Sequence, residues 1–152
     1  MGDAWVWVAF DPVTKLMIHA VVGKRTEEQA KAFILGLLGK LSGPSPLYTS
    51  DELPHYKRAL AEPHLTLIPV APTGKRGRPK KPVVCIDPQL QYATVHKIRD
   101  KGKVVKVERQ IVFGKEQDIN KILASSPVSV AINTSYVERH NLNLRQHSRR
   151  LT

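Results

Sequence analysis

The last predicted helix, residues 133–151, holds the side chains with the clearest chemical potential in the sequence. If this stretch is helical, Glu138 shares one stripe with Asn141, Arg145 and Arg149, which follow it at helical spacing. The carboxylate at the start of this face could bind a cation. The amide and guanidinium groups that follow it could bind an anionic polymer. The spacing of Ser135 and Glu138 also fits a capping box, in which Glu138 only satisfies backbone N–H groups at the helix start. Spacing alone favours that structural interpretation.

A second feature is a basic loop rich in glycine and proline, residues 71–82. Its core Arg-Gly-Arg-Pro resembles the AT-hook peptides that lie in the minor groove of DNA. Glycine lets the backbone approach the groove floor, proline keeps it extended, and the arginines enter the negative potential of a narrow A·T groove. The cations that we expect to contact DNA are Lys75, Arg76, Arg78, Lys80 and Lys81. A solvated connection is the alternative, and the charge distribution favours DNA contact.

Asp51 is a further candidate, because it directly follows a short predicted strand, residues 47–49. Ligands and metal ions gather at the carboxyl ends of strands in open α/β sheets. An N-cap or turn role also explains Asp51, and spacing alone favours that role. Asp11 precedes a proline just after another strand, which is ordinary turn chemistry. The histidines lack zinc-ligand spacing and Cys85 lacks a catalytic motif, so neither residue type suggests a site.

Charge is the most informative part of the composition. The chain has 152 residues, 41% of them apolar, and a formal net charge of +11. Residues 1–70 hold seven Lys or Arg against seven Asp or Glu, whereas residues 71–152 hold seventeen against six, so the excess lies in the second half. This asymmetry predicts nucleic acid as the first partner and an anionic membrane as a weaker second. No secretory signal or bilayer-length apolar run is present, and a single cysteine fits a reducing cytoplasm.

The elements that must position these groups predict an α/β fold with a mixed sheet flanked by helices. The first half is expected to contain a hairpin over residues 4–22, a helix capped by Thr26, a strand from 47, a helix containing Pro54 and a strand over 65–70. After the basic loop, we expect a hairpin over 92–113, a helix over 115–124 and the last helix. Residues 128–132 fit either a strand or an extended lead-in. The strand from 47 follows a helical crossover and should have a parallel partner, which implies a first strand missing from this chain.

Several stretches together resemble the DDE transposases of bacterial insertion sequences, in the group like insertion sequence one. The stretches that carry the resemblance are residues 2–11, 22–26, 49–56, 93–97 and 133–145. The run VERHNLNLRQ at 137–146 is the most specific of them, because it is long and unusual in composition. The resemblance covers nearly the whole chain, so residues 1–152 are expected to be a single transposase-like catalytic domain.

This resemblance implies a ribonuclease H-like fold whose three carboxylates hold two Mg²⁺ ions, with Mn²⁺ as a substitute. The ions would activate water or a 3′-hydroxyl for in-line attack on a DNA phosphodiester. Asp51 matches the second acid and Glu138 the third. The candidate DNA contacts on the last helix are Arg139, His140, Arg145 and Arg149. The implied partners are transposon ends and target DNA, and the implied location is the cytoplasm of a bacterium or archaeon, in association with the nucleoid.

Departures from the family limit the expected activity. The strand that carries the first acid is not matched, so we expect this chain alone to show weak or no strand transfer. Residues 71–131, with the basic loop, hairpin and short helix, resemble an insertion that contacts transposon-end DNA. The alternative, from another class, is a DNA-binding module without chemistry that uses the basic loop and the final helix. A third expectation is that an open sheet edge pairs with another chain in a homo-oligomer.

Overall fold

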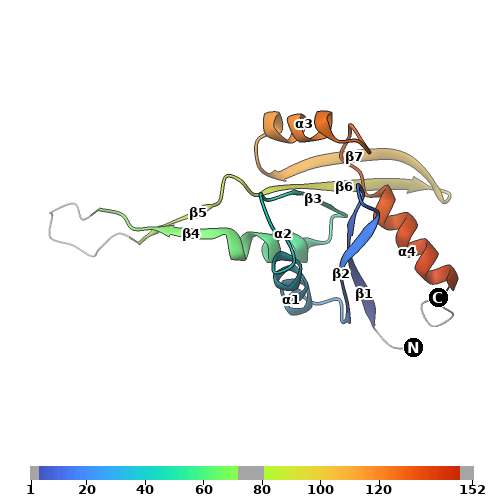
Figure 1. Ribbon diagram of the computed structural model, residues 1–152, viewed down its shortest axis with the longest axis horizontal. Coiled ribbons are helices and arrows are strands. Elements are labelled where there is room, and N and C mark those ends of the chain that lie inside the picture. The colour runs from blue at the N-terminus through green and yellow to red at the C-terminus, as the bar shows by residue number, and fades with distance from the viewer. Residues whose placement is uncertain (1–3, 72–80, 148–152) are drawn as a thin grey trace.

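The computed structural model describes residues 4–71 and 81–147, and it confirms a mixed α/β fold with a mixed sheet flanked by helices (Figure 1). Its described strands form a hairpin of β1 (Trp5–Asp11) and β2 (Leu16–Gly23), a sheet in the order β3 (Leu47–Ser50), β6 (Gln91–Asp100), β7 (Lys103–Phe113), and a pair of β4 (Leu65–Ile68) and β5 (Val83–Ile86). The helices are α1 (Glu27–Leu38), α2 (Pro54–Ala61), the short 3₁₀ turn η1 (Glu62–His64), α3 (Glu116–Ser125) and α4 (Ser135–His147). No helix in the described ranges is both long and apolar enough to cross a bilayer.

The β1–β2 hairpin forms as the sequence predicts, and Asp11 shapes its turn. The Asp11 carboxylate accepts hydrogen bonds from the Val13 N–H (3.0 Å) and from the Thr14 hydroxyl (2.6 Å). The Thr14 hydroxyl does most to hold the pKa of Asp11 below its ordinary value. The interpretation of Asp11 as a turn residue is therefore confirmed.

The three-stranded sheet has β6 at its centre, with Tyr92, Ala93 and Val95 buried. β3 runs parallel to β6, whereas β7 is antiparallel to it. Among the described residues, the parallel partner of β3 is thus β6, which follows it in the chain. Segment 71–131, expected as an insertion, supplies this central strand.

Two hydrophobic cores lie on opposite faces of the sheet. The first contains Trp7 and Leu60 with the apolar face of α1, which comprises Ala30, Phe33, Ile34 and Leu37. The second contains Ile119 of α3 and Ile132. Because successive side chains of a strand point to opposite faces, β6 contributes Tyr92 to the first core and Ala93 to the second. The N-cap of α1 is Thr26, as predicted, and its side chain accepts from the Gln29 N–H at 3.3 Å.

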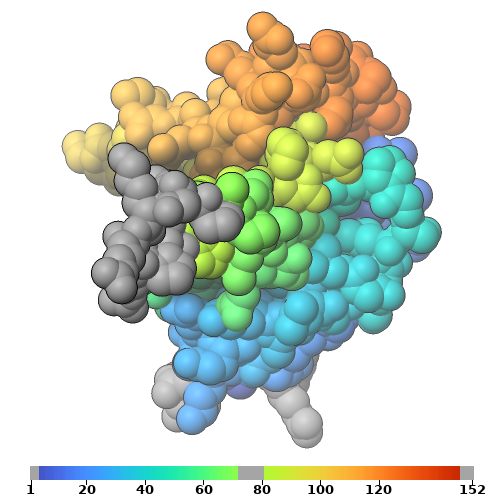
Figure 2. Space-filling view, turned by 90° about the vertical axis from the view of Figure 1, so that its left-hand side faces the viewer, coloured from blue at the N-terminus to red at the C-terminus, as the bar shows by residue number. Residues whose placement is uncertain are grey.

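The β4–β5 pair forms an arm that projects from the rest of the molecule (Figure 1). Figure 2 views the molecule from the side of this arm. Strand β5 was not expected from the sequence. Many of the arm's apolar side chains are exposed, namely Leu65, Leu67, Ile68, Val83, Val84 and Ile86. The cations Lys75, Arg76, Arg78 and Lys80, and Arg149 near the carboxyl end, lie outside the described residues.

Helix α4 is reached through an irregular lead-in, because residues 128–132 form no strand. Figure 1 shows α4 beside the β1–β2 hairpin. Two aromatic contacts join these elements: the Phe10 and His140 rings stack with centroids 5.0 Å apart, and the Lys15 ammonium lies 4.0 Å from the Tyr136 ring centroid. No residue of α4 is buried. The helix therefore covers the hairpin without being packed into either core.

Candidate functional site

A cavity with a volume of about 710 Å³ lies between β1, β3 and α4. Every residue of β1 and every residue of β3 lines it. Further lining comes from the apolar face of α1, from residues of the lead-in between Ser126 and Thr134, and from the inward side of α4. The cavity therefore collects side chains from both halves of the chain.

Asp51 and Glu138, the two acids expected to bind metal, both line this cavity. Asp51 directly follows β3, and Glu138 lies in the first turn of α4. The Thr49 hydroxyl donates to the Asn133 carbonyl at 3.3 Å, which fastens the end of β3 to the lead-in of α4. The fold thus brings two acids that are far apart in the sequence to the same hollow.

Glu138 is held by a cation and a hydroxyl. Lys97 Nζ on β6 lies 2.7 Å from Glu138 Oε1 and 2.6 Å from Oε2, and the Thr134 hydroxyl donates to Oε1 at 2.5 Å. Partial burial raises the pKa of Glu138, but the hydrogen bonds from Lys97 and Thr134 outweigh it and leave the pKa below its ordinary value. Glu138 is thus an ionised carboxylate in a charge-assisted contact.

The capping-box interpretation of Glu138 is wrong. The Glu138 carboxylate accepts from side chains of Lys97 and Thr134, whereas the Ser135 hydroxyl donates to Asn133 Oδ1 at 2.8 Å. A side chain 41 residues away, on β6, therefore takes the place of the local backbone donors that a capping box would use.

Asp51 is exposed, and it lines the cavity together with the half-buried Tyr56 and the buried Tyr92. Burial raises the pKa of Tyr56, and the negative charge of Asp51 raises it further. The Tyr92 pKa is raised in the same way by burial and by Asp51, while a hydrogen bond with Ser50 (2.7 Å) opposes the change. The neutral forms of these two phenols are therefore stable well above neutral pH.

A complete metal site is not formed by the described residues. Within residues 4–71 and 81–147, no three His, Cys, Asp or Glu side chains are grouped to hold one metal ion. Glu52, next to Asp51, is engaged with His96 (2.7 Å), and Glu138 is engaged with Lys97. Mg²⁺ prefers several oxygen ligands in near-octahedral geometry, so Asp51 and Glu138 can supply only part of its coordination, and Lys97 competes for one of them.

The residues of α4 that were predicted to contact DNA differ in how exposed they are. Arg139 and Arg145 are exposed, and Arg145 also lines the cavity. His140 is half-buried against Phe10, and its Nε2 atom is buried with no hydrogen-bond partner among the described residues. His140 therefore packs against β1. Lys81, at the end of the basic loop, is exposed.

Two cations near the site were not predicted from the sequence. Lys97 is one, and Arg25 is the other: its guanidinium lies 4.5 Å from the Trp5 ring centroid and it lines the cavity. Lys97 falls on the same strand face as the buried Ala93 and Val95. A lysine at the next position of a buried strand face needs a carboxylate partner. The alternation of Ala93, Val95 and Lys97 in the sequence could therefore have indicated that Lys97 pairs with an acid such as Glu138.

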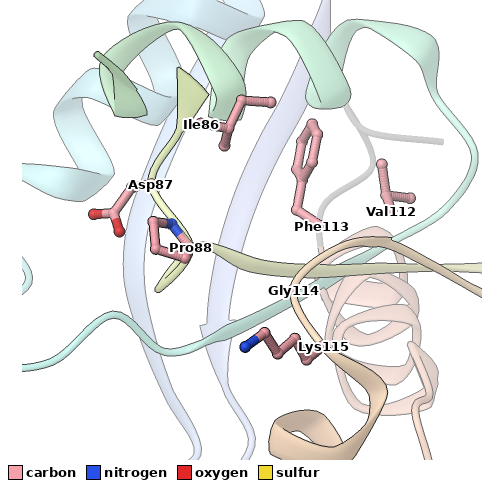
Figure 3. Close-up of a pocket in the computed structure, with 7 residues that line it drawn as sticks. All are labelled: Ile86, Asp87, Pro88, Val112, Phe113, Gly114 and Lys115. Carbon is pink, nitrogen blue, oxygen red and sulfur yellow. The ribbon is translucent and has the colours of Figure 1, made fainter. Parts of the chain in front are cut away.

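A smaller hollow of about 310 Å³ lies where β5 and β7 end (Figure 3). Figure 3 shows Ile86, Val112 and Phe113 along its upper side. The carboxylate of Asp87 accepts from the Gln89 N–H at 2.8 Å and so shapes the local turn. This hollow is therefore a packing feature between the arm and the sheet.

Comparison of the chain with protein-family models, with curated proteins and with solved structures gave no match.

Proposed function

We propose that this chain is a DNA-binding domain of the DDE transposase class with a ribonuclease H-like fold, in which Asp51 and Glu138 are two of the carboxylates that bind Mg²⁺ or Mn²⁺. The observation that carries the proposal is that both acids line one cavity, Asp51 at the carboxyl end of a strand in a mixed sheet. Carboxylates that converge from separate elements suit hard divalent cations. The charge excess of the second half of the chain supports a nucleic-acid partner.

The chemistry of this class is cleavage and joining of DNA phosphodiester bonds, with bound metal ions supplying the activation of the attacking oxygen. In this chain, Asp51 and Glu138 would hold the metal, and the exposed Arg139 and Arg145 would contact phosphates. Lys97 neutralises the charge of Glu138, and this ion pair must break before Glu138 can bind a metal ion. Weak cleavage by the chain alone follows from this competition and from the incomplete set of acids.

Metal binding tests the proposal directly. Free Mn²⁺ is measured by electron paramagnetic resonance during titration into the chain and into Asp51→Asn, Glu138→Gln and Lys97→Met. The two acid variants should weaken Mn²⁺ binding, and Lys97→Met should strengthen it because the competing ammonium is gone. Glu108→Gln is the matched control, since Glu108 also pairs with a lysine on the same sheet but does not line the cavity. Unchanged Mn²⁺ affinity in both acid variants would refute the metal role.

A second candidate is DNA binding without catalysis, and the Lys97–Glu138 ion pair favours it. In this case Asp51→Asn leaves DNA affinity intact and the chain shows no Mg²⁺-dependent cleavage. Arg139→Ala and Arg145→Ala should each weaken DNA binding. Each lost phosphate contact should also make the plot of log binding constant against log salt concentration less steep by about one unit. Arg78→Ala should weaken binding most on A·T-rich duplex, as expected for an AT-hook-like loop. DNA affinity that does not fall with salt would contradict both candidates.

A further inference from the structure

The far part of the β6–β7 hairpin projects from the body of the sheet. β3 pairs only with residues 91–94 of β6, so no described strand flanks the hairpin beyond that point. Every residue from 98 to 106 is exposed, and Figure 1 shows the hairpin running past β3 toward the end of the sheet where α4 lies. We call residues 98–106 the distal ribbon. It is a two-stranded element that is open to a partner on both faces.

The distal ribbon and the residues that join it to the sheet carry an excess of positive charge. Residues 97–109 hold six Lys or Arg against two Asp or Glu, a net charge of +4. Two of these lysines are already paired with glutamates. Arg99, Lys101 and Lys103 are exposed, and the described residues provide no ion-pair partner for any of the three. Three cations are thus available to an external anion.

The turn of the distal ribbon places a lysine at its tip. Lys101 and Gly102 both have positive φ, 47° and 81°, as the central residues of a type I′ hairpin turn require. Asn, Asp or Gly is preferred at the first of these two positions. Turn propensity therefore does not explain Lys101, which provides a charge at the point of the hairpin most distant from β3.

Duplex DNA fits this surface better than an added β-strand does. Lysines on open edges oppose pairing with another strand. The major groove of B-form DNA admits a two-stranded β-ribbon, and rows of phosphates border it. The exposed Val104 and Val105 lie between cations in the sequence, and apolar side chains can contact thymine methyl groups in that groove. The deep, narrow major groove of duplex RNA does not admit protein side chains in this way.

The distal ribbon lies on the side of the sheet that carries the candidate site. Arg99 falls on the same strand face as Lys97, which contacts Glu138. Burial raises the pKa of Glu138, the contacts with Lys97 and Thr134 lower it, and the charge of Arg99 lowers it further. Because a strand rises about 3.3 Å per residue, Lys101 lies about 13 Å along β6 from Lys97, or about four base pairs of duplex. One duplex can therefore contact both the ribbon and the site.

We propose that the distal ribbon enters the major groove of duplex DNA, with Arg99, Lys101 and Lys103 contacting the phosphates that border the groove. The inference rests on the nucleic-acid partner of the proposed function, and it adds the element, the groove and three contact residues. It narrows the DNA contact expected of segment 71–131 to a short stretch of that segment. It requires neither a bound metal ion nor the two acids of the site.

Fluorescence anisotropy with a labelled, mixed-sequence DNA duplex tests the ribbon in the full chain. The ribbon variant combines Arg99→Gln, Lys101→Asn and Lys103→Gln, and asparagine suits the turn position of Lys101. The charge-matched control removes three exposed lysines elsewhere, by Lys24→Gln, Lys40→Gln and Lys57→Gln. At about 0.1 M salt, the ribbon variant should bind the duplex about tenfold or more weakly than the control, and its plot of log binding constant against log salt concentration should be less steep by about three units.

The outcomes separate the ribbon from the proposed function. If the unaltered chain binds DNA in a salt-dependent way and the ribbon variant binds as tightly as the control, the ribbon assignment is overturned and the nucleic-acid partner stands. If the unaltered chain does not bind DNA at all, the proposed function fails, and the ribbon assignment fails with it.

Two further measurements distinguish groove binding from general charge and from misfolding. The ribbon variant should lose much less affinity for duplex RNA of the same sequence, and an equal loss on RNA and DNA would overturn the assignment to the major groove. Asp100→Asn removes the acid of the distal ribbon and should strengthen DNA binding roughly threefold, a gain that a misfolded variant would not show. Glu28→Gln on α1 is its control, since Glu28 is also exposed. A gain for Asp100→Asn no larger than that of the control would overturn the proposal.

Discussion

The ion pair between Lys97 and Glu138 gives a quantitative test of how the site is held. Replacing Lys97 by Met keeps the aliphatic part of the side chain and removes the ammonium that contacts both Glu138 oxygens. The Lys97 side chain is 21% exposed and that of Glu138 is 46% exposed, so solvent screens much of the attraction. We therefore expect a coupling free energy of about 0.5–1 kcal/mol, at the upper end for surface pairs and below that for buried pairs.

A double-mutant cycle measures this coupling. Urea unfolding gives the free energy of unfolding of the wild type, Lys97→Met, Glu138→Gln and the double variant, and the cycle isolates the pairwise contribution. The pair of Lys106 and Glu108 on β7 is the control, because its side chains are 66% and 50% exposed and its coupling should be smaller. A coupling at the Lys97–Glu138 pair no larger than that of the control would refute the structural reasoning.

The pH dependence of the coupling has a definite sign. The folded-state pKa of Glu138 is lowered, so the stabilisation is fully present above the ordinary carboxyl pKa and is lost as pH falls through the folded value. The cycle should therefore give its full coupling at neutral pH and a vanishing one in strong acid. A coupling that persists unchanged after the carboxylate is protonated would show that the contact is not electrostatic.

Three further substitutions test the packing that supports the site. Ile119→Ala, in the second core, should lower the free energy of unfolding by about 2–5 kcal/mol in urea titrations, whereas the more exposed Ile122→Ala should cost much less. Thr26→Ala removes the N-cap of α1 and should cost about 1 kcal/mol by the same measurement. Gly36→Ala normally favours a helix, but here its Cβ would lie 2.5 Å from His19 Nε2, so we expect a lower melting temperature; a higher one would show that the His19 ring moves aside freely.

Local sequence patterns predicted much of the secondary structure. The hairpin of β6 and β7 follows from alternation around a turn with Gly102, whose φ of 81° is easily adopted by glycine. The start of α1 follows from Thr26 and the spacing of apolar residues behind it. These features depend on neighbours within a few residues, which is why the sequence alone could indicate them.

Features that depend on distant partners were missed or misassigned. β5 is four residues long, and it is a strand because it pairs with β4 across the basic loop. The parallel pairing of β3 with β6 joins segments separated by more than forty residues, which no local period reveals. Spacing alone favoured a capping-box role for Glu138, but its carboxylate instead contacts Lys97, a residue 41 positions away in the sequence. Asp51 and Glu138 were predicted as a pair only through the resemblance to a family, and their shared cavity is a property of the fold.

The division of the interior into two cores has a consequence for how the molecule opens. The cores meet at the three-stranded sheet, where β6 places Tyr92 in one core and Ala93 and Val95 in the other, and where β3 and β7 also contribute side chains to both cores. Loss of α3 from the second core leaves the first core intact, and fraying of the β1–β2 hairpin leaves the second intact. Disruption of the shared sheet removes support from both cores. The molecule should therefore behave as two folding units joined by this sheet, and the amides of β6, its central strand, should be the last to exchange with solvent.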